Sequence, residues 1–289
     1  MYDLESLLKP RSPSAAVKAL ADSGQKSLYV AGGTILLHAR DSGIRTLIDL
    51  TSAGLEYVRA ERSFGGGGAS HLNIGAATKI ATLLRSPDAA LPGRGIIPEA
   101  ARTLATHTIR NLATVGGNIV AWHFPTDLPP VFLALKATLK IQSAAGVRSV
   151  PIEAFFTRRR EVFSRGDLIV EVSVPVEDGA RGAFVKIGRK RLDIAIVSAA
   201  VVLITDGLTI REARVALAGL NGAPARVSEV EQGLAGVAPT WSSLAEAGAR
   251  AAGLVEPRGD RRASAEYRKK LVEVAVRRAL WKAAGLSGE

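Results

Sequence analysis

The chain has 289 residues, and its 38 Lys and Arg against 27 Asp and Glu give a formal net charge of +11. Hydrophobic residues make up 47% and charged residues 22%, which is the composition of a folded globular protein with one large domain or two. The absence of cysteine excludes disulfides, thiolate nucleophiles and cysteine-held zinc or iron–sulfur clusters within this chain. The four histidines form no HExxH motif, so we expect no metal site.

The basic charge raises the question of nucleic acid. The sequence has no nucleic-acid motif and only 5% aromatic residues, which is poor for base stacking. An anionic cofactor or an acidic partner subunit explains a basic surface equally well. The N-terminal residues have no apolar signal core, and no run of 18 apolar residues occurs. We therefore expect a cytoplasmic protein with no nucleic-acid partner and no membrane span.

The first half of the chain mixes helices and strands. Hydrophobic periodicity in residues 1–52 predicts an α-β-α-β unit, with helices over 14–23 and 35–40 and strands over 27–31 and 46–50. Strand-like segments flank four glycines at 65–68, which lack the Lys-Ser/Thr of a phosphate loop and indicate a hairpin connection. The elements expected next are a helix over 78–86 capped by Thr78, a helix over 98–106, an apolar segment over 107–119, a helix over 128–137, a hairpin over 139–150 and a strand over 168–174.

Beyond Val174-Pro175 the pattern changes. Strands over 183–188, 195–205 and 210–218, joined by short turns, indicate a three-stranded antiparallel meander. Helices are expected over 227–235, 241–253 and 263–284. We therefore place a domain boundary at 174/175 and predict an α+β protein whose second domain, 175–289, is a small antiparallel sheet plus helices.

Two double-glycine loops are candidates for binding chemistry. They are Ala31-Gly32-Gly33-Thr34 and Thr114-Val115-Gly116-Gly117-Asn118, and each follows a predicted apolar segment. Consecutive backbone N–H groups without a Cβ, beside hydroxyl and amide side chains, suit the wrapping of a pyrophosphate. One such loop alone is more often a tight turn, whereas the pair favours anion binding. Neither loop is GxGxxG, which argues against a Rossmann dinucleotide fold.

Several ordered motifs make the chain resemble a known family, the FAD-binding (medium) subunits of the molybdenum hydroxylases of the carbon monoxide dehydrogenase and xanthine dehydrogenase type. The resemblance runs over nearly the whole chain. It is carried by VAGGTILL at 30–37, LNIGAAT at 72–78, IRNLATVGGNI at 109–119, DLPPVFLALKA at 127–137, Lys186, Asp193-Ile194-Ala195 and YRKKLVEVAVRRAL at 267–280. It implies a two-lobed FAD-binding domain over 1–174, with lobes of about 1–52 and 53–174, and FAD lying between the lobes and reaching the second domain.

The resemblance also implies roles for single residues. The two glycine loops would hold the pyrophosphate and nearby ribityl oxygens, and Asp127 would accept hydrogen bonds from FAD hydroxyls. Lys186 would lie near the isoalloxazine edge, where a cation stabilises a reduced, anionic flavin. The expected cofactor contacts are Tyr29, Val30, Ala31, Gly32, Gly33, Thr34, Ile35, Leu104, Thr114, Val115, Gly116, Gly117, Asn118, His123, Asp127, Leu168, Ile169, Lys186 and Ile194, with no catalytic or metal-ligating residue among them.

The sequence departs from the family at two places. Ile35 stands where Asp is common, and Trp122-His123 stand where small residues and Ser are common. For His123, flavin contact and an ordinary loop position are equally good interpretations.

The implied function is electron transfer. Electrons would pass from a molybdenum cofactor on a large subunit through [2Fe-2S] clusters on a small subunit to FAD here, and then to an external acceptor. The absence of cysteine agrees with clusters held elsewhere. Two alternatives remain at this point. One is a stand-alone FAD-dependent oxidoreductase, which would need an acid–base pair beside the flavin, with His123 and Asp127 as the only candidates. The other is a non-enzymatic basic binding module.

Overall fold

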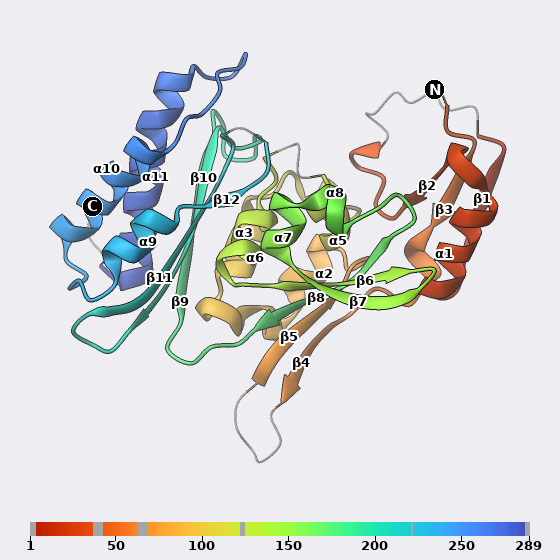
Figure 1. Cartoon of the computed structure of the whole chain (residues 1–289), viewed down its shortest axis with the longest axis horizontal. Coiled ribbons are helices and arrows are strands. Elements are labelled where there is room, and N and C mark those ends of the chain that lie inside the picture. Colours follow the sequence, from red (N-terminus) through yellow and green to blue (C-terminus); the bar gives the residue numbers. More distant parts are fainter. Residues whose placement is uncertain (1–3, 37–42, 63–68, 122–124, 221, 287–289) are drawn as a thin grey trace.

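The computed structural model describes residues 4–36, 43–62, 69–121, 125–220 and 222–286. Within these ranges the strands form three sheets, which follow one another along the long axis of the molecule (Figure 1). The N-terminal sheet lies at one end and the C-terminal sheet with its helices at the other. Helices and largely antiparallel sheets confirm the predicted α+β class.

The N-terminal sheet is small and parallel. It contains β1 (Ser6–Leu8), β2 (Ser27–Val30) and β3 (Thr46–Asp49) in the order β1-β3-β2. Helix α1 (Pro13–Asp22) begins where the Ser12 side chain accepts a hydrogen bond from the Ala15 amide, with Pro at its first position. The helix packs through its buried apolar face. It and strands β2 and β3 confirm three elements of the predicted α-β-α-β unit, whereas β1 was not predicted. Most of the helix expected over 35–40 lies outside the described residues.

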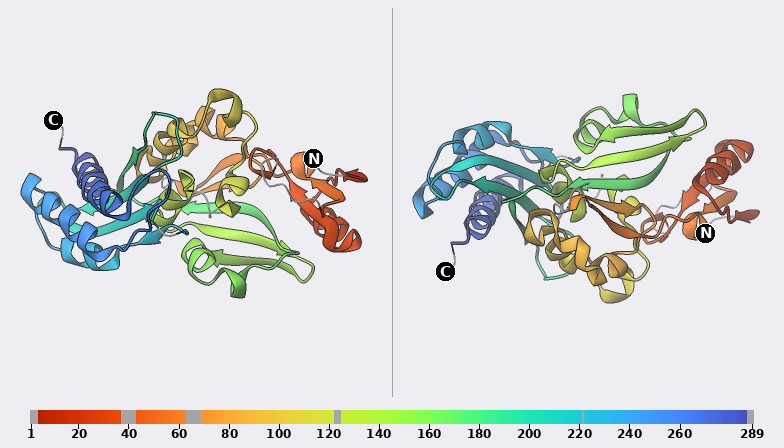
Figure 2. Two further views of the ribbon diagram at one scale, coloured as in Figure 1. Left: turned by 90° about the horizontal axis from the view of Figure 1, so that it is seen from above. Right: turned by 90° about the horizontal axis from the view of Figure 1, so that it is seen from below.

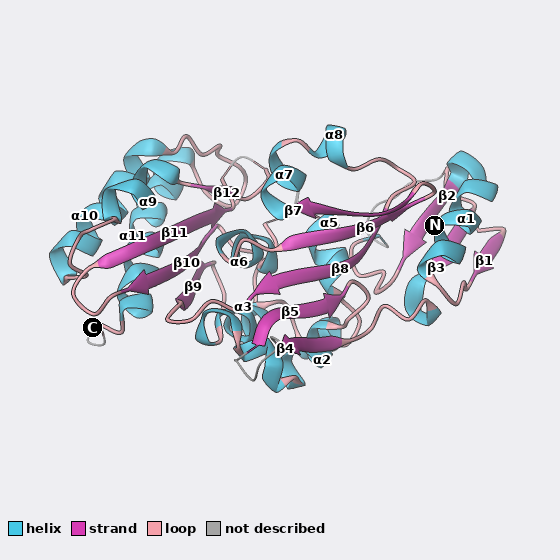
Figure 3. Ribbon diagram, turned by 60° about the horizontal axis from the view of Figure 1, so that its bottom comes forward, coloured by secondary structure: helices cyan, strands magenta, loops and turns pink. Residues whose placement is uncertain are grey.

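The middle sheet has five antiparallel strands. Their order is β4-β5-β8-β6-β7, and Figure 3 shows them side by side. Their bounds are β4 (Val58–Arg62), β5 (Ala69–Gly75), β6 (Thr138–Ser143), β7 (Gly146–Pro151) and β8 (Leu168–Pro175). The four glycines expected to join β4 to β5 lie outside the described residues.

Short helices connect and cover these strands. They are α2 (Ile80–Arg85), α3 (Ile96–Thr103), α4 (His107–Arg110), α5 (Val115–Val120), α6 (Leu128–Ala134), α7 (Ile152–Thr157) and α8 (Arg159–Val162), with 3-10 turns at Gly24–Lys26, Leu50–Ser52, Pro87–Ala90 and Pro92–Arg94. The expected cap at Thr78 is wrong, because α2 begins two residues later. The Thr78 hydroxyl instead accepts from the Tyr57 amide at 3.0 Å and donates to the Tyr57 carbonyl at 2.8 Å.

The C-terminal sheet has the order β12-β11-β10-β9 and is antiparallel. The three expected strands are β9 (Arg181–Ile187), β10 (Val197–Thr205) and β11 (Ile210–Ala218). The predicted count of three strands is corrected by a fourth, β12 (Ala225–Arg226), which is too short to show a period-two pattern. Helices α9 (Ser228–Leu234), α10 (Trp241–Leu254) and α11 (Ala265–Ala284) lie on the side of the sheet away from the middle sheet (Figures 1 and 2). None of the described helices combines the length and apolar character needed to cross a bilayer.

The C-terminal sheet is buried on both faces. Ala199 and Val201 of β10 pack with α10 and α11, whereas Ala200 and Val202 join the core of the middle sheet. A strand buried on both faces does not alternate apolar and polar residues, which explains the apolar run over 199–204 in β10. The two halves of the chain therefore share one apolar core. The domain boundary at 174/175 stays a prediction.

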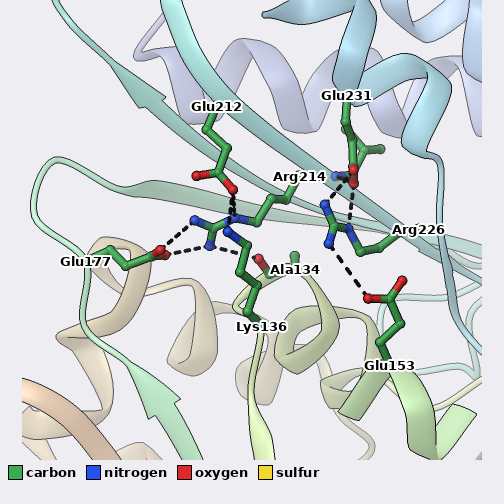
Figure 4. A network of polar contacts seen from close by, with 9 residues as sticks. Ala134, Lys136, Glu153, Glu177, Glu212, Arg214, Arg226 and Glu231 are labelled. Atoms are coloured by element: carbon green, nitrogen blue, oxygen red, sulfur yellow. Dashed lines mark hydrogen bonds and ion pairs between the residues drawn. The ribbon is translucent and has the colours of Figure 1, made fainter. Parts of the chain in front are cut away.

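Charged groups flank this shared core. Arg214 of β11 is fully buried and makes paired hydrogen bonds of 2.6 and 2.7 Å with Glu177 in the β8–β9 connection (Figure 4). Its Nε donates to Glu212 at 2.8 Å, and Glu212 also contacts Lys136, which follows α6, at 2.5 Å. The buried guanidinium is thus compensated by two carboxylates, as a charge in an apolar interface must be.

Candidate cofactor site

A cleft of about 320 Å³ opens between the first half of the chain and the C-terminal sheet. It continues into a second hollow of about 290 Å³, with which it shares Thr34, Ile35, Ala113 and Asn118. Side chains from both halves of the chain form the walls of the cleft, among them Leu104, Ile109, Asp127, Lys186, Leu192 and Ile194. The cleft and hollow together form an elongated and largely apolar site.

The first glycine loop lies directly after β2, and every residue from Tyr29 at the end of that strand to Leu36 beyond the loop lines the hollow. A Cβ on Gly32 would lie 2.0 Å from the Leu112 carbonyl oxygen, so glycine is required where this loop meets the chain before α5. Gly33 has φ +67°, a conformation that glycine adopts without strain. Within the described residues the amides of Gly32, Gly33 and Thr34 have no backbone acceptor, which leaves three N–H groups for an anion.

The second double glycine is not a loop. Residues 115–120 form α5, and Thr114 caps it by accepting from the Gly117 amide at 3.2 Å. The Val115 and Gly116 amides donate to the carbonyls of Thr78 and Ala76 at 2.9 and 2.8 Å, so these N–H groups already have acceptors. Glycine is a poor helix former, which is why the sequence indicated a loop here. The Gly116 position is set by packing, because a Cβ would lie 2.9 Å from Ala76.

The second segment still reaches the site through its side chains. Thr114 and Asn118 line the hollow, and Asn118 is only 7% exposed. Asn118 Oδ1 accepts from the Leu128 amide at 3.3 Å, so its amide nitrogen is the group left to donate to a ligand. Contact of this segment with FAD stays a prediction, with Thr114 Oγ1 and Asn118 Nδ2 as its remaining donors.

A buried ion pair closes the cleft between the two halves of the chain. Lys186 Nζ of β9 lies 2.8 Å from Asp127 Oδ2, which stands at the start of α6, and both side chains are almost fully buried. Lys186 also donates to the Thr103 carbonyl at 2.9 Å. Burial raises the pKa of Asp127, and the Lys186 cation and the Thr103 hydroxyl oppose that rise.

The same carboxylate has an unused acceptor. Asp127 Oδ1 is buried and has no hydrogen-bond partner among the described residues. A buried carboxylate oxygen without a donor is costly, so this atom indicates a ligand that donates to it. The sequence placed Asp127 and Lys186 at different parts of FAD, and the structure brings them into contact. Thr103 was missed: its carbonyl accepts from Lys186 and its hydroxyl donates to Asp127 Oδ2 at 3.4 Å, and a threonine 24 residues before Asp127 carries no local sequence signal.

The remaining predicted contacts lie in different parts of the structure. Leu104, Ile35 and Ile194 line the cleft, and Tyr29 and Val30 line the hollow. The Tyr29 hydroxyl donates to the Gly166 carbonyl at 3.2 Å, and burial with the nearby Asp167 raises its pKa to about 12. Leu168 and Ile169 of β8 are instead packed in the apolar clusters and line neither the cleft nor the hollow. Their contact with FAD stays a prediction. Trp122 and His123 lie outside the described residues.

Comparison with known proteins agrees with this geometry. Residues 3–177 match the family model of the FAD binding domain in molybdopterin dehydrogenase, and residues 182–283 match that of the CO dehydrogenase flavoprotein C-terminal domain. The chain belongs to the FAD-binding medium subunits of the molybdenum hydroxylases. It is 31% identical to the carbon monoxide dehydrogenase medium chain of Hydrogenophaga pseudoflava, over 94% of each chain.

Two further relatives support the assignment. Identity is 32% with the 6-hydroxypseudooxynicotine dehydrogenase complex subunit alpha of Paenarthrobacter nicotinovorans, over 93% of this chain and 90% of that one. The structure of carbon monoxide dehydrogenase from Hydrogenophaga pseudoflava that lacks the Mo-pyranopterin moiety superposes with a TM-score of 0.89, at 29% identity and over 100% of both chains. The resemblance inferred from the sequence motifs is therefore confirmed.

FAD is the cofactor of this family, and the described residues fit it. Three backbone N–H groups of the first glycine loop suit a pyrophosphate, and the apolar cleft suits a flat aromatic ring system. The unpaired Asp127 Oδ1 suits a hydroxyl or N–H donor.

Proposed function

We propose that the protein is the electron-transfer subunit of a molybdenum hydroxylase. It takes electrons from [2Fe-2S] clusters on a small partner subunit, which receive them from a molybdenum cofactor on a large one, and it passes them to an external acceptor. One observation carries the proposal: a chain with a fitting FAD cleft contains no cysteine to hold a cluster of its own.

The residues that would hold FAD follow from the site. The Gly32, Gly33 and Thr34 amides, with Thr114 and Asn118, bind the pyrophosphate and neighbouring oxygens. Asp127 Oδ1 accepts from a flavin donor, and Leu104, Ile35 and Ile194 exclude water from the ring. When bound, FAD accepts and donates electrons singly or in pairs, which suits a link between one-electron clusters and an acceptor.

The contacts of Asp127 and Lys186 favour a subunit over a stand-alone oxidoreductase. Asp127 and Lys186 are the ionisable groups buried in the described part of the cleft, and they bind each other and Thr103. In this proposal the free Asp127 Oδ1 accepts from FAD and Lys186 is bound to Asp127 and Thr103, so neither group is left to move a substrate proton. The chain's role is then to position FAD and set its electrostatic surroundings.

Purification of the chain alone and in complex with its partner subunits tests the proposal. We expect the chain alone to carry the flavin spectrum and to show no substrate-dependent flavin reduction, whereas the complex contains molybdenum and iron on other chains. Steady oxidation of an organic substrate by the chain alone would contradict the subunit function and favour the stand-alone enzyme. The division into domains at 174/175 and the cytoplasmic localisation stay predictions.

A further inference from the structure

Two basic loops meet at the cleft end of the C-terminal sheet. One joins β9 to β10 and carries Arg189, Lys190 and Arg191; the other precedes α11 and carries Arg258, Arg261 and Arg262. We call these six cationic residues the basic rim. The first loop follows the end of β9, and the second reaches the same sheet end because the Arg258 amide donates to the carbonyl of Leu220, just after β11.

Buried and half-buried hydrogen bonds hold the two loops together. Arg262 Nη1 donates to the Ala195 carbonyl at 3.1 Å. Arg268, which is almost fully buried, donates to the carbonyls of Ile196 and Gly219 and pairs with Asp260 at 2.7 Å. Arg262 of the second loop thus binds the first loop directly, and Arg268 of α11 connects Ile196 at the end of the first loop with Asp260 of the second. These bonds hold the two parts of the basic rim next to each other.

The basic rim borders the cofactor cleft on two sides. Leu192, Asp193 and Ile194 of the first loop line the cleft itself. Arg189 to Arg191 line a hollow that also touches Lys186 and Thr103, and Arg258 and Arg262 line a hollow that shares Pro125 with the cleft. A partner seated on the basic rim would therefore lie against the cofactor site.

The charges of the basic rim are largely uncompensated. Asp260 forms ion pairs with Arg262 and Arg268, and a carboxylate oxygen of Asp193 lies 3.9 Å from Arg189 Nε. Lys190, Arg191, Arg258 and Arg261 are exposed and form no ion pair with any described residue. Beside them Ile194 is 52% exposed. An apolar contact flanked by free cations is the usual anatomy of a surface for an acidic protein.

We propose that the basic rim docks an acidic electron-carrier protein against the cofactor cleft. This inference rests on the proposed function and identifies the class of its external acceptor. A protein fits better than a small anion, because the free cations are spread over two exposed loops and do not converge on one buried point. Surface charge of this kind accelerates encounter of oppositely charged proteins about 10- to 1000-fold at low salt.

The test uses the whole complex and two forms of one carrier. Horse cytochrome c is basic, and succinylation of its lysines makes it acidic while keeping the haem. The complex is reduced, freed of excess reductant and mixed with each form in a stopped-flow instrument. We expect electron transfer to the acidic form to be at least about tenfold faster at about 10 mM salt, and the preference to vanish at about 1 M.

Charge-reversal variants locate the surface. The double variant Arg191→Glu/Arg261→Glu should remove the preference for the acidic form. The matched control is Arg211→Glu/Arg278→Glu, which changes the net charge equally. Arg211 is exposed at the opposite end of β11, and Arg278 is exposed about 15 Å along α11 from Arg268. The control should keep the preference, and flavin content and subunit composition are measured for each protein.

Three results would overturn the inference. Equal rates with both cytochromes, or an unchanged preference in the Arg191→Glu/Arg261→Glu variant, would show that the basic rim does not select an acidic carrier. Loss of a partner subunit in that variant alone would show the basic rim to be a subunit interface. Absence of electron transfer to both forms with flavin bound would instead contradict the electron-transfer function itself.

Discussion

At the scale of single residues, the Lys186–Asp127 ion pair is the buried charge pair of the cleft, and the stability of the protein depends on it. We expect Lys186→Met to destabilise the protein by about 3–5 kcal/mol at pH 8, because it leaves Asp127 buried without its cation. Burial already raises the pKa of Asp127, and loss of Lys186 raises it further. The folded state then holds its proton to higher pH than the unfolded state.

The sign of the pH dependence follows from that proton. Because the folded state of Lys186→Met binds a proton that the unfolded state releases above about pH 4, its stability falls as the pH rises from there. Urea unfolding at pH 5 and pH 8 measures this, and the loss should be smaller at pH 5. Adding Asp127→Asn to Lys186→Met should restore stability at pH 8 and make the loss of stability equal at pH 5 and pH 8. An equal loss at both pH values would show that Asp127 stays ionised without Lys186.

Gly32 provides a second test at this scale. In Gly32→Ala the new Cβ would lie 2.0 Å from the Leu112 carbonyl, and overpacking of this kind costs about 1–3 kcal/mol. The first glycine loop must shift, so we expect FAD affinity to fall about tenfold or more, measured by flavin fluorescence on titration. Gly253→Ala in α10 is the control, since nothing lies within 4 Å of its Cβ. Unchanged affinity in Gly32→Ala would remove this loop from the FAD site.

At the scale of elements, the Arg214 network fixes β11 to the first half of the chain. Arg214→Met removes the cation shared by Glu177 and Glu212. Because these carboxylates are 29% and 39% exposed and Glu212 keeps Lys136, the expected cost is about 1–3 kcal/mol of unfolding free energy. Arg211→Met, on an exposed position of the same strand, should stay within about 0.5 kcal/mol. Chemical denaturation of both variants decides, and equal small effects would show that the network contributes little.

The network also has a pH signature. Hydrogen bonds from Arg214 and Lys136 lower the pKa of Glu212 to about 2. Its stabilising effect is therefore complete above the unfolded pKa near 4.5 and is lost as the pH falls towards 2. Wild-type stability should drop over this range, and the Arg214→Met protein should lose less of its remaining stability there. A parallel drop in both proteins would assign the acid sensitivity to other carboxylates.

Local patterns predicted what local forces decide. Helix α1, strands β2 and β3, the C-terminal strands and the long helix α11, expected over 263–284 and found at Ala265–Ala284, follow from periodicity and caps. The α5 helix was missed because its two glycines have low helix propensity. The Thr114 cap and packing of Gly116 on Ala76 stabilise it in the folded chain. The Lys186–Asp127 contact joins residues 59 positions apart, and the Arg214–Glu177 contact joins residues 37 apart. No periodicity in one sequence signals such pairs.

At the scale of the whole molecule, the two halves of the chain are joined by more than their connection. Phe184, Ala200 and Val202 from the C-terminal sheet belong to the same apolar cluster as the middle sheet. Lys186–Asp127 at one place and the Arg214 network at another add buried charge pairs across the same interface. Interfaces between domains are more often small and polar, and then the domains move relative to each other.

This shared core predicts that a cut connection will not separate the halves. Asp178-Gly179 is an exposed turn between β8 and β9, and a protease site inserted there can be cleaved in the folded protein. We expect the two fragments to elute together in size-exclusion chromatography and to keep the flavin spectrum, because the apolar contacts and ion pairs stay in place. The Arg214→Met variant, cleaved in the same way, should dissociate at lower urea concentration. Separation of wild-type fragments with loss of flavin would instead make the halves weakly docked domains held by their connection.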